Sequence, residues 1–425
     1  MGNSTTGIGG SEHLSTYARF AAQVVGSIPA ESLLEADDLA AFVSQKKRRG
    51  REVDLGITLN ARKVVVVLKA TRRCNLRCTY CNSWSDNPRN IMSMRTLITV
   101  IARILSVVNV TRFEFVWHGG EVTLLNPHFF KTLIWLQQQF RQPGQEITNA
   151  LQTNAIDLSD EWLIFLNGAG VPVGISIDGY PAINDSRRID LLGRGTSKRV
   201  EKGIQQLRDY SIPYGALVVV DRAVSQSDLN QLFDYFKRTR INAIEFLNIV
   251  PDNRVASGAL NDPSYINYRE YIQFLCEAFS LWYSGYKDSI RVNLFNEIMD
   301  KMAHEDAILS SCYWSGNCSQ EVVTVEPNGE ITPCDKFIAD EGSQYGSLLE
   351  QNIDALLSHS EYNQRLRQEE RDAYKSMQDC EWFSLCHGGC PHDRIINRRH
   401  DGSYQNQCCG TDQLFELISQ TLRVA

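Results

Sequence analysis

The sequence lacks any apolar run long enough to cross a membrane or to act as a secretion signal. Its longest uninterrupted apolar stretches, such as Val64–Leu68, have only the length of a strand. The first residues, Met1–Ser15, are polar and rich in glycine and serine, without the apolar core of a signal peptide. We therefore expect a cytoplasmic protein without a membrane partner.

The sequence also lacks an excess of basic residues. It contains 43 Lys and Arg against 50 Asp and Glu, which gives a formal net charge of -7. Broad nucleic-acid binding needs a basic surface, so this balance argues against a nucleic-acid partner. The basic run Lys46–Arg49 is interpreted as a solvated helix end, with a patch that steers an acidic substrate or leader peptide as the alternative.

Cysteine is plentiful, and its distribution is uneven. Eleven of the twelve cysteines lie in residues 74–81 and 312–409. The twelfth, Cys276, lies in an apolar helical stretch, where we interpret it as core packing. In a reducing compartment, clustered cysteines more often bind metals than form disulfides. The sequence therefore predicts metal sites in two separate parts of the chain.

Strand-like and helix-like segments alternate through the middle of the chain. This alternation predicts an α/β fold with a parallel sheet and right-handed crossovers. Six strands favour an open, partial (β/α)6 TIM-like barrel, in which catalytic residues lie at the carboxyl ends of the strands. The predicted strands are residues 62–69, 112–117, 146–152, 171–177, 214–220 and 243–250.

The rest of the chain divides around this barrel. Asn328-Gly329 between two β-like runs predicts a hairpin in the cysteine-rich part, whose weak apolar periodicity implies that metal sites stabilise it. The predicted parts are a mostly helical N-terminal segment (1–61), the barrel (62–263), a helical bridge (264–311), the cysteine-rich region (312–409) and a C-terminal helix (410–425).

The first cysteine cluster follows the first predicted strand. Cys74, Cys78 and Cys81 have the spacing CxxxCxxC. Three thiolates can bind three irons of a [4Fe–4S] cube and leave the fourth iron open. Zinc is the alternative, but zinc usually takes four closed ligands, and no fourth ligand is near in the sequence.

This segment is identified as the motif of the radical S-adenosylmethionine (SAM) enzymes, with Tyr80 in the aromatic position beside the last cysteine. The resemblance implies that the open iron binds SAM, and that reductive cleavage of SAM gives a 5′-deoxyadenosyl radical. It also implies a low-potential electron donor such as flavodoxin or ferredoxin.

Residues that resemble the SAM-binding positions of this family recur at later predicted strand ends. Gly119, Gly120 and Glu121 resemble the GGE segment, whose glycines are expected to let the backbone approach the SAM amino group. An arginine is expected to meet the SAM carboxylate, with Arg199 as the choice and Arg188 as its rival. The other expected SAM contacts are Gln152, Asn154, Ser176 and Asp178.

The C-terminal cysteines resemble those of a SPASM domain, which carries auxiliary [4Fe–4S] clusters in many peptide-modifying radical SAM enzymes. The resemblance implies one or two auxiliary clusters. By analogy, the ligands of the first are Cys312, Cys318, Cys334 and Cys390, and those of the second are Cys380, Cys386 and either Cys408 or Cys409.

One position departs from the SPASM pattern. The family has a cysteine three residues before Cys380, and this chain has Met377. A thioether is a poor iron ligand compared with a thiolate. The second auxiliary cluster therefore has an open iron, which could take a substrate, or is completed by Cys409, Asp379 or His387.

The resemblance extends to function. Our main hypothesis is a maturase that abstracts a hydrogen from a side chain of a ribosomally made precursor peptide and forms an oxidised product, an intramolecular cross-link of the cyclophane type. The alternative is an anaerobic sulfatase-type maturase that makes formylglycine, with Asp335, beside Cys334, as the candidate base. A small-molecule dehydrogenase and an iron–sulfur electron-transfer protein also stay open.

Overall fold

The computed structural model describes residues 62–81, 90–107, 109–251, 262–304, 306–307, 311–337, 340, 342–402 and 404–424. The predicted N-terminal helical segment lies outside these residues. Among the helices that are described, none is both long and apolar enough to cross a membrane.

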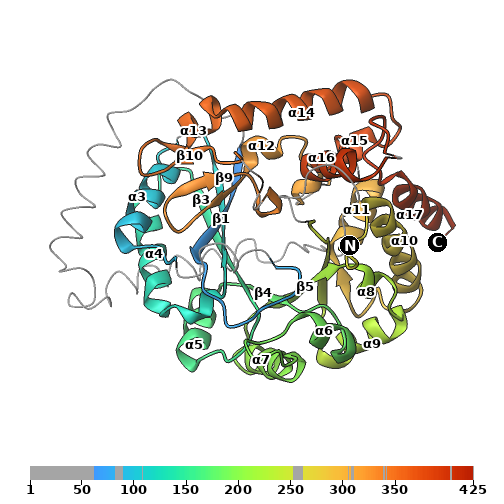
Figure 1. The fold of residues 1–425 in the computed structure, drawn as a ribbon, viewed down its shortest axis with the longest axis horizontal. Coiled ribbons are helices and arrows are strands. Elements are labelled where there is room, and N and C mark those ends of the chain that lie inside the picture. The colour runs from blue at the N-terminus through green and yellow to red at the C-terminus, as the bar shows by residue number, and fades with distance from the viewer. Residues whose placement is uncertain are drawn as a thin grey trace, which may run out of the picture.

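One sheet of ten strands organises the described part of the chain, in the order β10-β9-β8-β1-β2-β3-β4-β5-β6-β7 (Figure 1). All six predicted strands form and lie side by side in chain order as parallel neighbours, so the predicted α/β fold is confirmed. The strands are β1 (Lys63–Thr71), β2 (Arg112–Gly119), β3 (Glu146–Thr153), β4 (Val173–Ser176), β5 (Tyr214–Val220), β6 (Ala243–Asn248), β7 (Arg291–Val292), β8 (Val322–Val325), β9 (Glu330–Thr332) and β10 (Gly346–Ser347).

Helices pack on the outer face of the sheet (Figure 1). The first of them buries Leu97, Ile101 and Ile104, which recur at helical spacing and form one apolar face. The helices of this part are α3 (Met94–Leu105), α4 (Pro127–Phe140), α5 (Asp160–Ala169), α6 (Pro181–Arg187), α7 (Ser197–Asp209), α8 (Arg222–Ser225), α9 (Leu229–Thr239), α10 (Tyr268–Gly285) and α11 (Asn293–Ala303), with the 3-10 turn η2 (Val122–Leu124).

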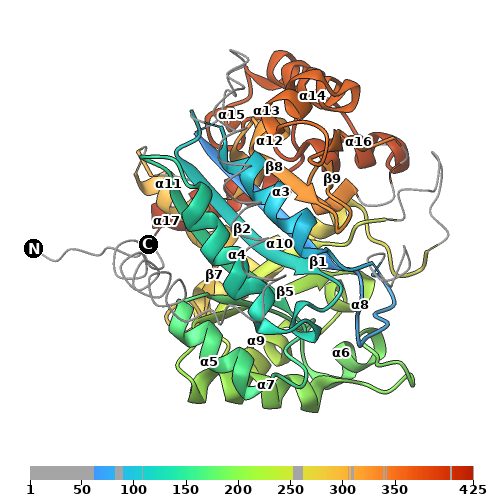
Figure 2. The same cartoon turned by 90° about the vertical axis from the view of Figure 1, so that its left-hand side faces the viewer.

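The cysteine-rich region consists mostly of helices, which lie together at one end of the molecule (Figure 2). They are α12 (Cys318–Glu321), α13 (Ile353–His359), α14 (Glu361–Met377), α15 (Phe383–Cys386) and α16 (Pro391–His400), with the 3-10 turns η3 (Cys312–Trp314) and η4 (Asp335–Phe337). The terminal helix α17 (Asp412–Val424) follows this region and packs against α10 and α11.

Two details differ from the sequence prediction. The fourth strand begins at Val173 rather than at residue 171, because Pro172 has no N–H to donate to a ladder. The predicted helical bridge contains the short strand β7 between α10 and α11. Cys276 lies in α10, half-buried against the core, as expected for core packing.

The predicted hairpin forms and extends the barrel sheet. β8 pairs in parallel with β1, with Val325 opposite Leu68, and β9 returns antiparallel to β8. At the turn, Gly329 has a φ of 87°, which glycine adopts readily. The segment after β9, which contains Cys334, is thereby brought to the inner side of β1.

Candidate functional site

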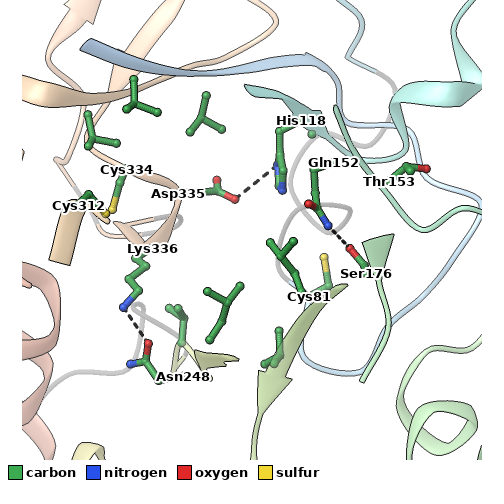
Figure 3. Close-up of a pocket in the computed structure, with 18 of the residues that line it drawn as sticks. Cys81, His118, Gln152, Thr153, Ser176, Asn248, Cys312, Cys334, Asp335 and Lys336 are labelled. Carbon is green, nitrogen blue, oxygen red and sulfur yellow. Dashed lines mark hydrogen bonds and ion pairs between the residues drawn. The ribbon is translucent and has the colours of Figure 1, made fainter. Parts of the chain in front are cut away.

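A cavity of about 680 Å³ inside the barrel is lined by cysteines from both of the cysteine-containing regions of the chain. Figure 3 shows Cys312 and Cys334 on one side and Cys81 on the other, with His118 and Asp335 between them. A volume of this size is typical of cofactor and ligand sites. The cysteines that line it are Cys74, Cys78, Cys81, Cys312, Cys318, Cys334 and Cys390.

The CxxxCxxC loop directly follows β1. It is anchored by hydrogen bonds to the last residue of α6 and to the segment that follows α6. The N–H of Arg77 donates to the carbonyl of Ile189 at 2.8 Å, and the N–H of Thr79 donates to that of Arg187 at 2.9 Å. Burial raises the pKa of the Cys74 thiol to about 12 and that of Cys78 to about 11. Three thiols that share one cavity beside an open volume fit an iron–sulfur cluster with a free coordination site.

Gly119 and Gly120 line the cavity, and the structure gives a steric reason for both glycines. A Cβ on Gly119 would lie 2.1 Å from the carbonyl oxygen of Thr71, and one on Gly120 would lie 2.0 Å from that of Arg73. The N–H of Gly120 donates to Thr71 at 2.7 Å. The glycines therefore allow β2 to approach the start of the cysteine loop closely.

Glu121 is buried and joins the ends of β2 and β3. Its carboxylate accepts hydrogen bonds from the Thr153 hydroxyl at 2.7 Å and from the N–H of Asn154 at 2.8 Å. The Asn154 amide in turn donates to the side-chain oxygen of Asn75 in the cysteine loop at 2.8 Å. This chain of contacts fixes three consecutive strand ends around the cavity.

Asp178 is fully buried and organises two residues that face the cavity. Its carboxylate accepts hydrogen bonds from the Tyr80 hydroxyl at 2.8 Å and from Nε of Arg188 at 2.9 Å. Nη1 of Arg188 lies 3.8 Å from Sγ of Cys78. Tyr80 and Arg188 line the cavity. Asp178 thus supports these two side chains from behind the cavity wall.

The remaining expected SAM contacts divide between two locations. Gln152 and Ser176 line the cavity, and the Gln152 amide donates to the Ser176 hydroxyl at 2.6 Å (Figure 3). Arg199 does not line it, and its half-exposed side chain pairs with Asp157 and, at 3.7 Å, with Asp190. Of the two arginines considered from the sequence, Arg188 is therefore the one that the structure places in the cavity.

Asp335 lies between Lys69 and His118, which are register partners in the β1–β2 pair. It forms an ion pair with Lys69, and its Oδ2 lies 3.7 Å from Nδ1 of His118. Burial would raise the pKa of Asp335, but the neighbouring cationic groups, with Lys69 the largest contributor, together lower this pKa to about 2. Burial lowers the pKa of His118. Asp335 is therefore ionised and His118 neutral at pH 7.

A second charged group lies beside Cys312, Cys334 and Cys390 and was missed from the sequence. Nζ of Lys336 lies 2.8 Å from the Tyr313 hydroxyl, 2.8 Å from Oδ1 of Asn248 (Figure 3) and 2.9 Å from Oδ1 of Asp393. Burial would lower the pKa of Lys336, but Asp393, together with Tyr313 and Cys390, raises this pKa well above its usual value. Lys336 thus carries a positive charge inside the cavity wall. In the sequence, the only feature that could have pointed to Lys336 was its position directly after Asp335.

The four other C-terminal cysteines, Cys380, Cys386, Cys408 and Cys409, lie outside the lining of this cavity. The thiol of Cys409 contacts those of Cys386 and Cys408. No group of three or more His, Cys, Asp or Glu in the described residues converges on a single metal ion. The thiolates of a cubane stand at its separate corners and need not converge in that way.

The candidates for the missing ligand at this second group differ in position. Met377 is buried, at 2% exposure, and Asp379 is exposed. Nδ1 of His387 lies 2.6 Å from the carbonyl oxygen of Trp314. Cys409, which contacts two of the other thiols, is therefore best placed to complete the set.

Comparison with known proteins agrees with this arrangement. The profile of the radical SAM superfamily matches residues 68–236, and that of SPASM, an iron–sulfur cluster-binding domain, matches residues 312–382. The cysteine-type anaerobic sulfatase-maturating enzyme of Clostridium perfringens (strain 13 / Type A) is 28% identical over 361 residues, which cover 83% of this chain and 95% of that protein. The serine-type anaerobic sulfatase-maturating enzyme of Bacteroides thetaiotaomicron is 28% identical over 369 residues, which cover 81% of this chain and 87% of that protein.

A solved structure is also similar. Native anSMEcpe with bound AdoMet (SAM) and the Cp18Cys peptide superposes with a TM-score of 0.71 at 25% identity, covering 84% of this chain and 96% of that chain. The two matched domains imply SAM and [4Fe–4S] clusters as cofactors. The chain contains a radical SAM domain and a C-terminal SPASM domain.

Proposed function

We propose that this protein is an oxidoreductase that converts a Ser or Cys side chain of a peptide or protein to formylglycine, the reaction of the anaerobic sulfatase-type maturases that its sequence resembles. The observation that carries this proposal is a cavity lined by two groups of cysteines, with Asp335 between the groups (Figure 3). The groups are Cys74, Cys78 and Cys81, and Cys312, Cys318, Cys334 and Cys390. Relatives named for serine and for cysteine substrates match this chain at the same 28% identity, so the residue oxidised is left to experiment.

When bound, SAM with a cluster at Cys74, Cys78 and Cys81 supplies a hydrogen-abstracting radical, and an auxiliary cluster supplies an electron acceptor. The cavity residues best placed to hold SAM are Tyr80, Gly119, Gly120, Gln152, Ser176 and Arg188. The guanidinium of Arg188 lies close to Cys78 and carries the charge that a SAM carboxylate requires. In our proposal Arg188 takes the role first given to Arg199, while Glu121, Asn154 and Asp178 hold the strand ends in place.

Asp335 is the proposed base. Oxidation of an alcohol to an aldehyde, or of a thiol to a thioaldehyde, removes the O–H or S–H proton as well as a hydrogen from carbon, so a proton acceptor must face the substrate. The Asp335 carboxylate faces the cavity and is ionised at neutral pH, because Lys69 and the other neighbouring cationic groups together lower its pKa despite burial. Lys69 and His118 fix its orientation from the barrel side.

The first auxiliary cluster is proposed at Cys312, Cys318, Cys334 and Cys390. All four line the cavity, and Asp335 directly follows Cys334. A substrate held against Asp335 would therefore lie beside these ligands. This placement fits a two-electron oxidation, in which one electron must leave the substrate after the hydrogen atom has been removed.

The test is an anaerobic incubation of the iron-reconstituted protein with SAM, dithionite and the Cp18Cys peptide or its serine counterpart. The proposal predicts 5′-deoxyadenosine and a peptide aldehyde that reacts with a hydrazine reagent. The serine peptide would lose two hydrogen atoms to give the aldehyde directly. The cysteine peptide would lose two hydrogen atoms to give a thioaldehyde, which water hydrolyses to the aldehyde with release of hydrogen sulfide. 5′-Deoxyadenosine with neither peptide changed would contradict the proposed substrate class.

Peptide cross-linking is the second candidate, and Met377 favours it. The sulfatase-maturase pattern carries a cysteine at this position, and here a buried methionine takes its place. A cross-linked peptide also loses two hydrogen atoms, but it gains no aldehyde. Mass spectrometry of peptides encoded beside the gene, with and without the hydrazine reagent, separates the two candidates.

A further inference from the structure

The turn between α6 and α7, two helices labelled in Figure 2, carries two adjacent leucines that are exposed. Leu191 is 60% exposed and Leu192 is 75% exposed. The buried carboxylate of Asp190 organises this turn, since it accepts hydrogen bonds from the N–H groups of Leu192 at 2.9 Å and Arg194 at 3.0 Å and pairs with the Arg194 guanidinium. These hydrogen bonds fix the conformation of the turn, which keeps both leucine side chains exposed to solvent.

The same turn is attached to the loop that carries Cys74, Cys78 and Cys81. Leu76 and Asp190 form an antiparallel bridge, and the N–H of Arg77 donates to Ile189 at 2.8 Å. Only a few covalent bonds and one hydrogen bond separate the exposed leucines from the cysteine loop. An electron carrier bound at the turn would thus have a short path to a cluster on this loop.

The surface around the turn is basic, although the whole chain has a net charge of -7. The two segments in contact, residues 72–77 and 187–199, contain eight Arg and Lys and one acid, Asp190. Three of these cations, Arg72, Arg187 and Arg188, are buried and do not contribute to the surface. Arg73, Arg194 and Lys198 are exposed. Asp157, which pairs with Arg199, and Asp185, which accepts from the N–H of Thr196, are the neighbouring acids.

We propose that the Leu191–Leu192 turn and its basic surroundings dock an acidic one-electron carrier protein of the flavodoxin or ferredoxin class. An apolar centre with a charged rim is the usual composition of a protein interface, and opposite charge steers such partners together. The donor is oxidised by one electron and the cluster beside Cys78 is reduced by one electron, with no atom transferred. The inference rests on the radical SAM assignment and is independent of the substrate that the protein oxidises.

The experiment compares two reductants on the iron-reconstituted, full-length protein. The double variant Leu191→Ser/Leu192→Ser removes the apolar centre, and Lys198→Glu reverses one exposed charge. Ile164→Ser is the matched control, because Ile164 is 63% exposed on α5, away from the cysteine loop. Each protein receives SAM with either reduced flavodoxin or dithionite, and the rate of 5′-deoxyadenosine formation is measured.

With sub-saturating flavodoxin, we expect the double variant to lose about tenfold in rate and Lys198→Glu to lose severalfold and become less sensitive to salt. With dithionite, both variants should match the parent protein, and Ile164→Ser should match it with both reductants. An unchanged flavodoxin rate would overturn the proposal. An equal loss with both reductants would overturn it too, and would assign the turn a structural role.

A substrate peptide is the competing occupant of this surface. If the double variant raised the KM for the peptide under dithionite while flavodoxin reduction stayed normal, the turn would belong to the substrate and the docking proposal would be wrong. Failure of the proposed formylglycine chemistry would instead leave peptides unchanged in every variant, with the flavodoxin effect intact.

Discussion

His118 of β2 and Asp335 of the SPASM domain lie 3.7 Å apart, from Nδ1 to Oδ2, although 217 positions separate them in the sequence (335 minus 118). Lys69, which is opposite His118 in the β1–β2 register, pairs with the same carboxylate. The contact exists because β8 pairs with β1 and carries the segment after β9 along the inner side of the barrel. The proposed base is therefore held jointly by the two domains.

Removing the charge of Asp335 should separate the two stages of the reaction. Asp335→Asn conserves volume but cannot accept the substrate proton, so we expect peptide oxidation to fall about a hundredfold or more, the usual contribution of a positioned base. 5′-Deoxyadenosine formation should change only severalfold. Liquid chromatography of both products in one reaction checks this. Equal loss of both would indicate a structural role for Asp335 near the cluster.

The two arginines considered as SAM ligands provide a matched pair of variants. Arg188→Lys keeps the positive charge but loses the planar guanidinium, whose Nε donates to Asp178 and whose Nη1 lies near Cys78. We therefore expect the Kd for SAM to rise about tenfold. Arg199→Lys should leave the Kd within twofold, because Arg199 lies outside the cavity. Equilibrium dialysis with SAM checks this. The opposite order of effects would restore Arg199 as the SAM ligand.

The second auxiliary cluster is expected to depend on Cys409 and not on Met377. Cys409→Ala removes a thiol that contacts Cys386 and Cys408, so iron per chain should fall by about one cube. Met377→Leu conserves the buried volume and should leave the iron content unchanged. Iron analysis of anaerobically prepared protein checks both variants. Normal iron in Cys409→Ala would mean that Cys409 is not a ligand.

Glu245 should make the folded state less stable as the pH rises. Burial, with Glu297 nearby, raises the pKa of Glu245 from 4.5 to about 8. Between these values the folded state binds the proton more tightly than the unfolded state, so the free energy of unfolding falls with rising pH by up to about 1.4 kcal/mol per pH unit. Anaerobic urea unfolding across this range should show a smaller decrease in Glu245→Gln. If the free energy of unfolding fell equally with pH in the parent protein and in Glu245→Gln, Glu245 would not be the cause of the pH dependence.

The sequence predicted the central strands well, because their apolar runs alternate with amphipathic helices and end in polar residues. It also placed Cys74, Cys78, Cys81 and the strand-end residues in one region, since parallel strands end at the same edge of a sheet. Pattern reasoning could not show that β8 joins the barrel through β1, because strand pairing depends on contacts between distant segments.

Lys69, His118 and Lys336 were missed for the same reason. Lys69 is an isolated polar residue at the end of an apolar strand, and only its pairing with Asp335 and Glu326 gives it a role in the site. The choice between Arg188 and Arg199 likewise depended on which side chain faces inward. Neighbouring residues of one segment can face a cavity or solvent, and the sequence alone contained no signal to separate them.

The most direct test of the account measures 5′-deoxyadenosine in the parent protein and in the triple variant Cys74→Ala/Cys78→Ala/Cys81→Ala, under strictly anaerobic conditions with SAM and dithionite. The account predicts 5′-deoxyadenosine from the parent protein and none from the variant, which should still hold iron at its C-terminal cysteines. Undiminished 5′-deoxyadenosine from the triple variant would contradict the assignment of radical SAM chemistry to these three cysteines.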